Sequence, residues 1–219
     1  MFKTSVLLSN LLYAIKAAQR GQTVEEMAEK DWPTNLLHMR LLDEKGGALI
    51  NMARRLGEDI EVIYCDVDDF GEIDKKAGYN KANTILTHLG AAVWESTRDN
   101  DLPFVQGDQV LIVSLGGGHA HHLAKRIHEA WNKKVDEDET LTELRKPQAK
   151  SDWRLPTQLS FTYGHQIIHP GDAGTPEKLL KWASDEANMR MSFFKFDKKR
   201  YKRQLTGNEQ APYLPALNT

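Results

Sequence analysis

Two acidic groups in this sequence occupy positions where they could do chemistry together. Asp66 opens an acidic cluster directly after the β-branched run 60–65, where a buried strand would meet solvent. Asp108 lies in a turn between two apolar stretches, next to Gly107, which permits the tight bend. Carboxylates from separate strand ends can hold Mg²⁺ or Mn²⁺ together with substrate phosphates. The pattern therefore points to metal-assisted phosphoryl transfer, with Asp66 and Asp108 as the ligands.

Each acidic group also has an ordinary structural explanation. Polar residues often end a strand, and an aspartate beside a glycine often makes a turn. The occurrence of both, in this order along the chain, favours a site. Gly107 would also let a nucleotide approach the backbone closely, because it has no Cβ.

The hydrophobic pattern predicts the elements that would position these groups. Periodic apolar residues predict helices, and β-branched or alternating runs predict strands. The predicted helices cover residues 36–55, 80–98, 120–131 and 176–191, and the predicted strands cover residues 60–65, 104–105, 110–115 and 159–163. The polar segment 133–156 is predicted to be a surface loop. This order indicates an α/β domain of the α+β kind, a layered sheet with helices packed on it.

Length and composition limit the kind of protein. With 219 residues, 40% of them hydrophobic, the chain fits one soluble domain with short additions. We expect a helical extension over 1–30, the main domain over 31–203 and a loose tail over 204–219. The extension has apolar residues at helical spacing, and either packing or dimerisation explains it.

Charge and cysteine content narrow the partners and the location. The formal charge of −2 provides no general basic field, so no nucleic-acid partner is expected. Cys65 is the only cysteine, which favours a reducing compartment and a cytoplasmic location. No stretch is long and apolar enough to cross a bilayer, so no membrane association is expected.

Several stretches resemble motifs of the GGDEF (diguanylate cyclase) family. They follow the family's order along most of the chain and include a degenerate form of the signature itself. Residues 31–40 resemble D-x-L-T-G-L-x-N-R, 66–74 resemble D-x-D-x-F-K-x-I-N, 106–110 align with the signature, 159–164 resemble a late strand ending S-x-G, and 179–187 resemble L-L-x-x-A-D-x-A.

The resemblance implies a fold and a reaction. The fold would be palm-like, with a mostly antiparallel central sheet flanked by helices. Two such domains would face each other as a homodimer, each holding GTP and metal ions, and would produce cyclic di-GMP. By position, Asp66 and Asp108 would bind metal with the backbone carbonyl of Val67, and Gly107 would lie under the phosphates.

Some site positions depart from the family pattern. Gln106 and Gln109 stand where the signature has glycine and glutamate, and Gly71 replaces a lysine. The family reads guanine with an asparagine and an aspartate, and here those positions hold Asp74 and Asn83, the reverse types.

The phosphate-binding lysine of the last helix aligns near Ser192, with Lys195 as a candidate replacement. Upstream of the signature, Arg98 and Asp101 match the family's R-x-x-D product site, one residue closer than usual. A solvated loop is the alternative explanation for that match.

Three functions remain open from the sequence. The first is a GGDEF-like domain that binds a metal ion and a guanine nucleotide and that would, if active, be a diguanylate cyclase. The second is an inactive GGDEF-like domain that senses a nucleotide, such as GTP or a cyclic dinucleotide, or binds a partner protein. The third is a palm related to the CRISPR polymerases that uses ATP.

Overall fold

The central feature of the computed structural model, which describes residues 29–147 and 152–204, is a five-stranded sheet in the order β1-β3-β4-β2-β5. β1 runs parallel to β3, and every other neighbouring pair is antiparallel. The strands are β1 (Leu37–His38), β2 (Ile60–Val67), β3 (Leu102–Gln106), β4 (Gln109–Leu115) and β5 (Phe161–Ile168). The expected mostly antiparallel sheet is confirmed.

Six α-helices and three shorter helical turns connect the strands within the described residues. The helices are α3 (Gly47–Leu56), α4 (Phe70–Ala77), α5 (Tyr79–Ser96), α6 (Ala120–Glu137), α7 (Glu139–Thr142) and α8 (Pro176–Gln204). The shorter turns are a 3-10 turn at Met39–Leu41, a π turn at Leu42–Gly46 and a 3-10 turn at Glu143–Arg145. In the part of the chain described here, no helix has both the length and the apolar character needed to cross a bilayer.

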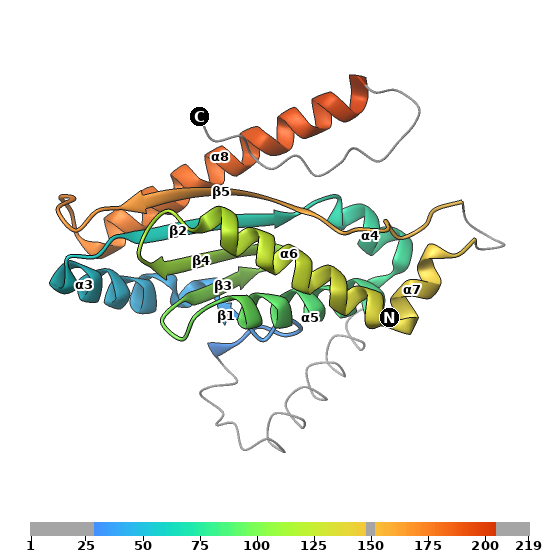
Figure 1. Cartoon of the computed structure of the whole chain (residues 1–219), viewed down its shortest axis with the longest axis horizontal. Helices are drawn as coiled ribbons and strands as arrows, with labels where there is room; N and C mark the ends of the chain where they lie inside the picture. Colours follow the sequence, from blue (N-terminus) through green and yellow to red (C-terminus); the bar gives the residue numbers. More distant parts are fainter. Residues whose placement is uncertain (1–28, 148–151, 205–219) are drawn as a thin grey trace, which may run out of the picture.

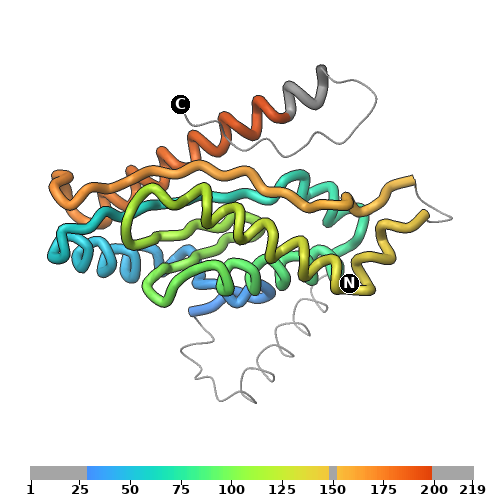
Figure 2. The backbone as a smooth tube through the Cα atoms, viewed as in Figure 1, coloured from blue at the N-terminus to red at the C-terminus, as the bar shows by residue number. Residues whose placement is uncertain are grey.

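The sheet separates two hydrophobic cores, and β2 contributes to both because successive side chains of a strand point to opposite faces. Ile63, Cys65 and Val67 pack on one face with residues of α5 and α6. Ile60 and Val62 pack on the other face with residues of α3 and α8. The result is a three-layer arrangement in which the sheet lies between two pairs of helices (Figures 1 and 2).

Helix α8 lies directly on β5, and a glycine makes this possible. A Cβ on Gly164 would collide with the backbone of α8 at Ala187 and Met191. The side chains of Leu180, Ala183, Ala187 and Met191 lie on the packed face of the helix, and all of them are nearly or fully buried. Close packing therefore fixes the path of α8 along the sheet, as Figure 1 shows for the red helix beside β5.

Three predictions about elements need correction. The predicted helix over 36–55 begins as β1 and becomes α-helical only at Gly47, because Leu37 pairs with Phe104 at the sheet edge. Helix α4, directly after β2, was not predicted. The predicted loop 133–156 contains the end of α6 and all of α7, because Leu141 supplies a fully buried side chain and Asp138 caps α7.

The other predicted elements are confirmed with different lengths. Strand β2 continues two residues beyond the predicted run, and β5 continues to Ile168. Helix α8 runs to Gln204 instead of ending near residue 191. The expected extension falls almost entirely on residues 1–28, which are outside the described part, as are residues 205–219.

Candidate functional site

Asp66 lies at the end of β2 on the sheet face that α8 covers. Its Oδ2 accepts a hydrogen bond from Gln109 Nε2 at 3.0 Å, and the Oε1 of Gln109 accepts one from the Tyr64 hydroxyl at 2.9 Å. Its Oδ1 accepts a hydrogen bond from the Lys195 ammonium. Since Tyr64 and Asp66 are two residues apart on a strand, they point to the same face. Both carboxylate oxygens of Asp66 are thus paired within the protein.

Asp108 stands beside Asp66 in the turn between β3 and β4. Its backbone carbonyl accepts a hydrogen bond from Val67 N–H at 3.3 Å, which joins the turn to the end of β2. Burial and the negative charge of Asp66 raise the pKa of the Asp108 carboxyl, and the charge of Lys195 offsets this only in part. The two carboxylates predicted as ligands are therefore brought together, and their repulsion makes the site favourable for a cation.

The turn before Asp108 is open on its outer side. Gly107 has φ of 65°, and a Cβ there would meet no atom within 4 Å. A left-handed φ favours glycine, and the empty space leaves the backbone accessible to a ligand. The expected place of Gly107 under bound phosphates stays a prediction.

A second acidic group, Asp68, is held by neighbouring side chains. Its carboxylate accepts hydrogen bonds from Ser160 Oγ at 2.6 Å, Thr162 Oγ1 at 2.7 Å and Lys198 Nζ at 2.6 Å. Burial alone would raise the pKa of Asp68, but the charge of Lys198 and the hydrogen bonds hold it below its ordinary value. Asp68 is therefore an ionised group with an internal counter-ion.

The donor set fits a hard divalent cation that also has phosphate ligands. The carboxylates of Asp66 and Asp108 and the carbonyl of Val67 are oxygen donors, which Mg²⁺ and Mn²⁺ prefer. Among the described residues, no three acidic, histidine or cysteine side chains gather as a metal site of their own. A metal here would complete its coordination with nucleotide oxygens, as Mg²⁺ commonly does.

Comparison with known proteins identifies the family to which this arrangement belongs. A family model described as "Diguanylate cyclase, GGDEF domain" matches residues 28–191. The chain belongs to the GGDEF family. Diguanylate cyclase DosC of Escherichia coli K12 is 35% identical over 82 residues, which are 37% of this chain and 18% of DosC. The chain thus matches less than a fifth of the length of that curated relative.

Solved GGDEF structures share the fold. The coiled coil and GGDEF domain of DgcB from Caulobacter crescentus, in complex with cyclic di-GMP, has a TM-score of 0.57 at 13% identity, covering 92% of this chain and 96% of that one. The GGDEF domain of YfiN from Pseudomonas aeruginosa has a TM-score of 0.55 at 22% identity, covering 75% and 87%. At these identities the likeness shows the GGDEF fold alone.

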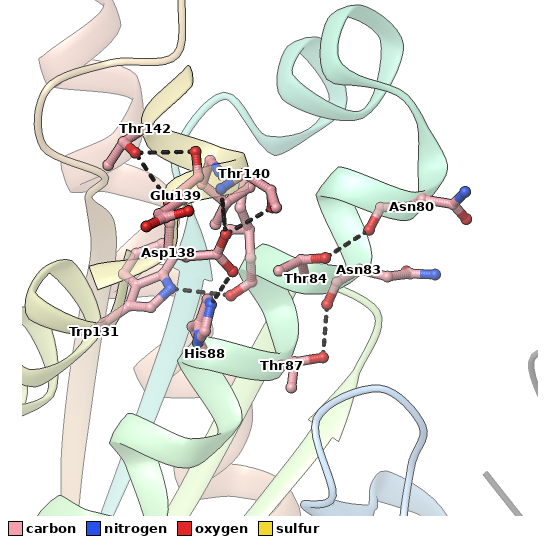
Figure 3. A network of polar contacts seen from close by, with 12 residues as sticks. Asn80, Asn83, Thr84, Thr87, His88, Trp131, Asp138, Glu139, Thr140 and Thr142 are labelled. Atoms are coloured by element: carbon pink, nitrogen blue, oxygen red, sulfur yellow. Dashed lines mark hydrogen bonds and ion pairs between the residues drawn. The ribbon is translucent and has the colours of Figure 1, made fainter. Parts of the chain in front are cut away.

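The two residues assigned to the base lie on the helices that follow β2. Asp74 is exposed on α4, and Asn83 is half-buried on α5. Asn83 Nδ2 is shielded from solvent and has no hydrogen-bond partner among the described residues. Figure 3 shows the side chain of Asn83 pointing away from the network around His88 and Asp138. No contact among the described residues ties either base candidate to Asp66 or Asp108, so their shared role stays a prediction.

The turn at Arg98 and Asp101, which resembles the family's product site, is held by hydrogen bonds to its buried aspartate. Asp101 is 4% exposed, and its carboxylate accepts hydrogen bonds from Arg98 N–H at 2.8 Å and Ser114 Oγ at 2.5 Å. The aspartate closes its own turn and anchors it to β4. The Asp101 carboxylate therefore faces the protein interior in this structure, and a product site at Arg98 and Asp101 stays a prediction.

Sequence reasoning missed several partners of the site. Tyr64, Lys198 and Ser160 were not assigned to it. Two signals could have found them: Tyr64 is two residues before Asp66 on a strand, and Lys198 is three residues after Lys195 on a helix. Ser160 carried no such signal, because its approach to Asp68 depends on the pairing of β5 with β2.

Proposed function

We propose that this GGDEF domain binds a guanine nucleotide with Mg²⁺ or Mn²⁺ at Asp66, Asp108 and the Val67 carbonyl. The same site would, in a pair of facing copies, join two GTP molecules into cyclic di-GMP. The proposal rests chiefly on the proximity of the Asp66 and Asp108 carboxylates, which is close enough for the charge of one to raise the pKa of the other. A cation relieves that repulsion, and a triphosphate brings the remaining oxygen ligands.

Each residue would contribute by position and charge. A bound divalent cation would neutralise charge that develops on the phosphates during transfer. Gly107 would leave room for the phosphates against the backbone, and Gln109 would fix the orientation of Asp66. Asp74 and Asn83 would read the base.

The proposed base preference can be tested by calorimetric titration with GTP and ATP analogues in the presence of Mg²⁺. Guanine offers N1–H and an exocyclic amine as donors, and a carboxylate such as that of Asp74 accepts both. Asp74 is exposed in the free domain, so the cost arises only when a bound base covers it. Leaving a polar group that is covered in this way unpaired costs about 1–3 kcal/mol, so we expect roughly tenfold or stronger preference for guanine. Asp74→Asn should reduce this preference. Equal or tighter binding of the ATP analogue would contradict the proposal and favour the ATP-using palm.

A second function, binding without turnover, is favoured by Gln109. The family glutamate at this position would add a carboxylate near Asp66, whereas the amide donates a hydrogen bond to it. Incubation of the protein with labelled GTP and Mg²⁺ or Mn²⁺, followed by identification of the products, separates the two functions. Cyclic di-GMP that disappears in Asp66→Asn supports the cyclase. Metal-dependent GTP binding without product supports a sensor or protein-interaction module.

A further inference from the structure

Helix α8 changes character along the single face that it turns toward the sheet. The first half of this face is apolar and buried, through Leu180, Ala183, Ala187 and Met191. Spacings of three to four residues continue the same face to Lys195 and Lys198. The packing that holds α8 on β5 therefore also directs two ammonium groups at the acidic end of β2.

The atoms that Lys195 contacts are those proposed as metal ligands. Its ammonium donates to Asp66 Oδ1 and to the Val67 carbonyl, the latter at 3.3 Å. The side chains of Lys195 and Asp66 are only 21% and 14% exposed. Water screens this pair less than it screens a surface salt bridge, so the ammonium is a strong occupant of the position.

We propose that Lys195 is an internal cation that competes with the divalent metal for Asp66 and the Val67 carbonyl, so that helix α8 sets the metal affinity of the site. This inference rests on the proposed function, since it takes Asp66 as a metal ligand. The ammonium already uses a lone pair of Asp66 Oδ1 and of the Val67 carbonyl, and its charge would repel a divalent ion held by the same groups. We therefore expect metal to bind when Lys195 swings away, which its flexible four-carbon stem permits.

Mn²⁺ titration followed by electron paramagnetic resonance tests the competition directly, because the signal of free Mn²⁺ falls as the ion binds. Lys195→Met keeps the length and helix propensity of the side chain and removes its charge. We expect this variant to bind Mn²⁺ about tenfold or more tightly than the wild type, since a charge-assisted hydrogen bond no longer has to be broken. Lys181→Met is the matched control, because Lys181 lies exposed on the same helix and pairs with Asp185.

The outcomes separate the inference from the function on which it rests. If Asp66→Asn abolishes wild-type Mn²⁺ binding while Lys195→Met leaves the affinity equal or lower, the competition is refuted and the metal site stands. If Mn²⁺ binding is absent, or is unchanged by Asp66→Asn in every background, both the site and the competition fail. A similar gain of affinity in Lys181→Met would also refute the competition, because loss of any positive charge would then suffice.

A measurement on the wild-type protein keeps the proposal testable if Lys195→Met folds poorly. Acetylation of lysines, read by mass spectrometry, reports how accessible each ammonium is. Saturating Mg²⁺ should raise the labelling rate of Lys195 several-fold while that of Lys181 stays constant. An unchanged or lower labelling rate of Lys195 would overturn the competition.

Discussion

At the scale of single residues, the amide of Gln109 occupies the signature position where the family has glutamate. The amide bridges two side chains of β2, donating to Asp66 and accepting from Tyr64. A glutamate could accept from Tyr64 but could not donate to Asp66. The substitution therefore exchanges a potential metal ligand for a hydrogen bond that fixes Asp66 when no metal is present.

The first prediction concerns this exchange. Gln109→Glu should tighten Mn²⁺ binding about tenfold, because it adds a carboxylate beside Asp66 and Asp108. It should also destabilise the metal-free protein by about 1–3 kcal/mol, since a hydrogen bond becomes a repulsion between like charges. Mn²⁺ titration and urea unfolding with and without Mn²⁺ measure the two effects. Gln166→Glu, which adds the same charge further along the sheet, is the control and should leave the affinity unchanged.

The buried position of Cys65 could be predicted from the sequence. Cys65 was expected inside a buried strand, and it is 7% exposed on β2. Burial and the nearby Asp66 raise the pKa of its thiol to about 12. A thiol that stays protonated is a poor nucleophile, so Cys65 contributes to the core rather than to chemistry.

At the scale of elements, the sequence predicted those strands and helices whose residues repeat with one period. Strands β2 and β4 and helices α5 and α6 have such patterns and were found. The segment that contains β1 was assigned to a helix because its two strand residues are too few to show alternation. Helix α4 is short, with Ile73 as its one buried residue, and it begins after Asp69, which has a left-handed φ of 56°. Both depend on tertiary contacts that no local pattern reports.

Part of the candidate site could also be predicted from the sequence. Asp66, Asp108 and Gly107 adjoin strand ends and a turn, so the sheet order suffices to bring them together. The hydrogen bonds of Lys195 and Lys198 depend instead on how far α8 extends and at what angle it crosses β5. The close approach of α8 to β5 depends on packing at Gly164, whereas the spacing of Lys195 and Lys198 shows only that they share one face of the helix.

The second prediction tests that packing. Gly164→Ala should destabilise the protein by roughly 1–3 kcal/mol, because its Cβ would be forced against the backbone of α8. The substitution should also weaken the contact of Lys195 with Asp66, since α8 must shift. Urea unfolding measures the first effect, and lysine acetylation of Lys195 measures the second. Gly171→Ala, where a Cβ meets nothing within 4 Å, should be close to neutral.

The third prediction concerns the cap of α7, where Asp138 links three helices (Figure 3). Its carboxylate accepts from Thr140 N–H and Leu141 N–H and lies 2.9 Å from His88 Nε2. Although burial opposes ionisation, hydrogen bonds from Thr140 and His88 lower the pKa of Asp138 to about 2. Asp138→Asn should cost about 1 kcal/mol of unfolding free energy at pH 6.

The pH dependence follows from the lowered pKa. A carboxyl whose pKa is lower in the folded state stabilises the protein above its unfolded value of 3.8, and that stabilisation is lost as the pH falls toward 2. The difference between wild type and Asp138→Asn should therefore shrink between pH 4 and pH 2, on urea unfolding curves at each pH. Asp136→Asn, which breaks only an exposed pair with Arg145, should show a smaller effect at pH 6. A difference that grows on acidification would refute the assignment.

At the scale of the whole molecule, the two candidate ligands lie at one end of a sheet whose faces are both covered by helices. Helices α5 and α6 cover one face, and α3 and α8 cover the other. The end of the sheet beside Gly107 is therefore the direction from which a nucleotide, and a second domain carrying another, can approach.

The last prediction follows from this geometry and from the proposed cyclase reaction. If each copy supplies one GTP, product formation requires two chains to face each other, so product per chain should fall on dilution through the range where dimers dissociate. Adding an excess of Asp108→Asn chain at constant wild-type concentration should lower the product formed per wild-type chain, because mixed pairs contain one impaired site. An equal excess of an unrelated protein is the control.

Activity per chain that stays constant far below any measurable dimer concentration would rule out the face-to-face reaction. A stable dimer alone would not establish the face-to-face reaction, since contacts away from Asp66 and Asp108 can also hold two chains together. The decisive result is thus the loss of activity in mixed pairs, which depends on the two sites meeting.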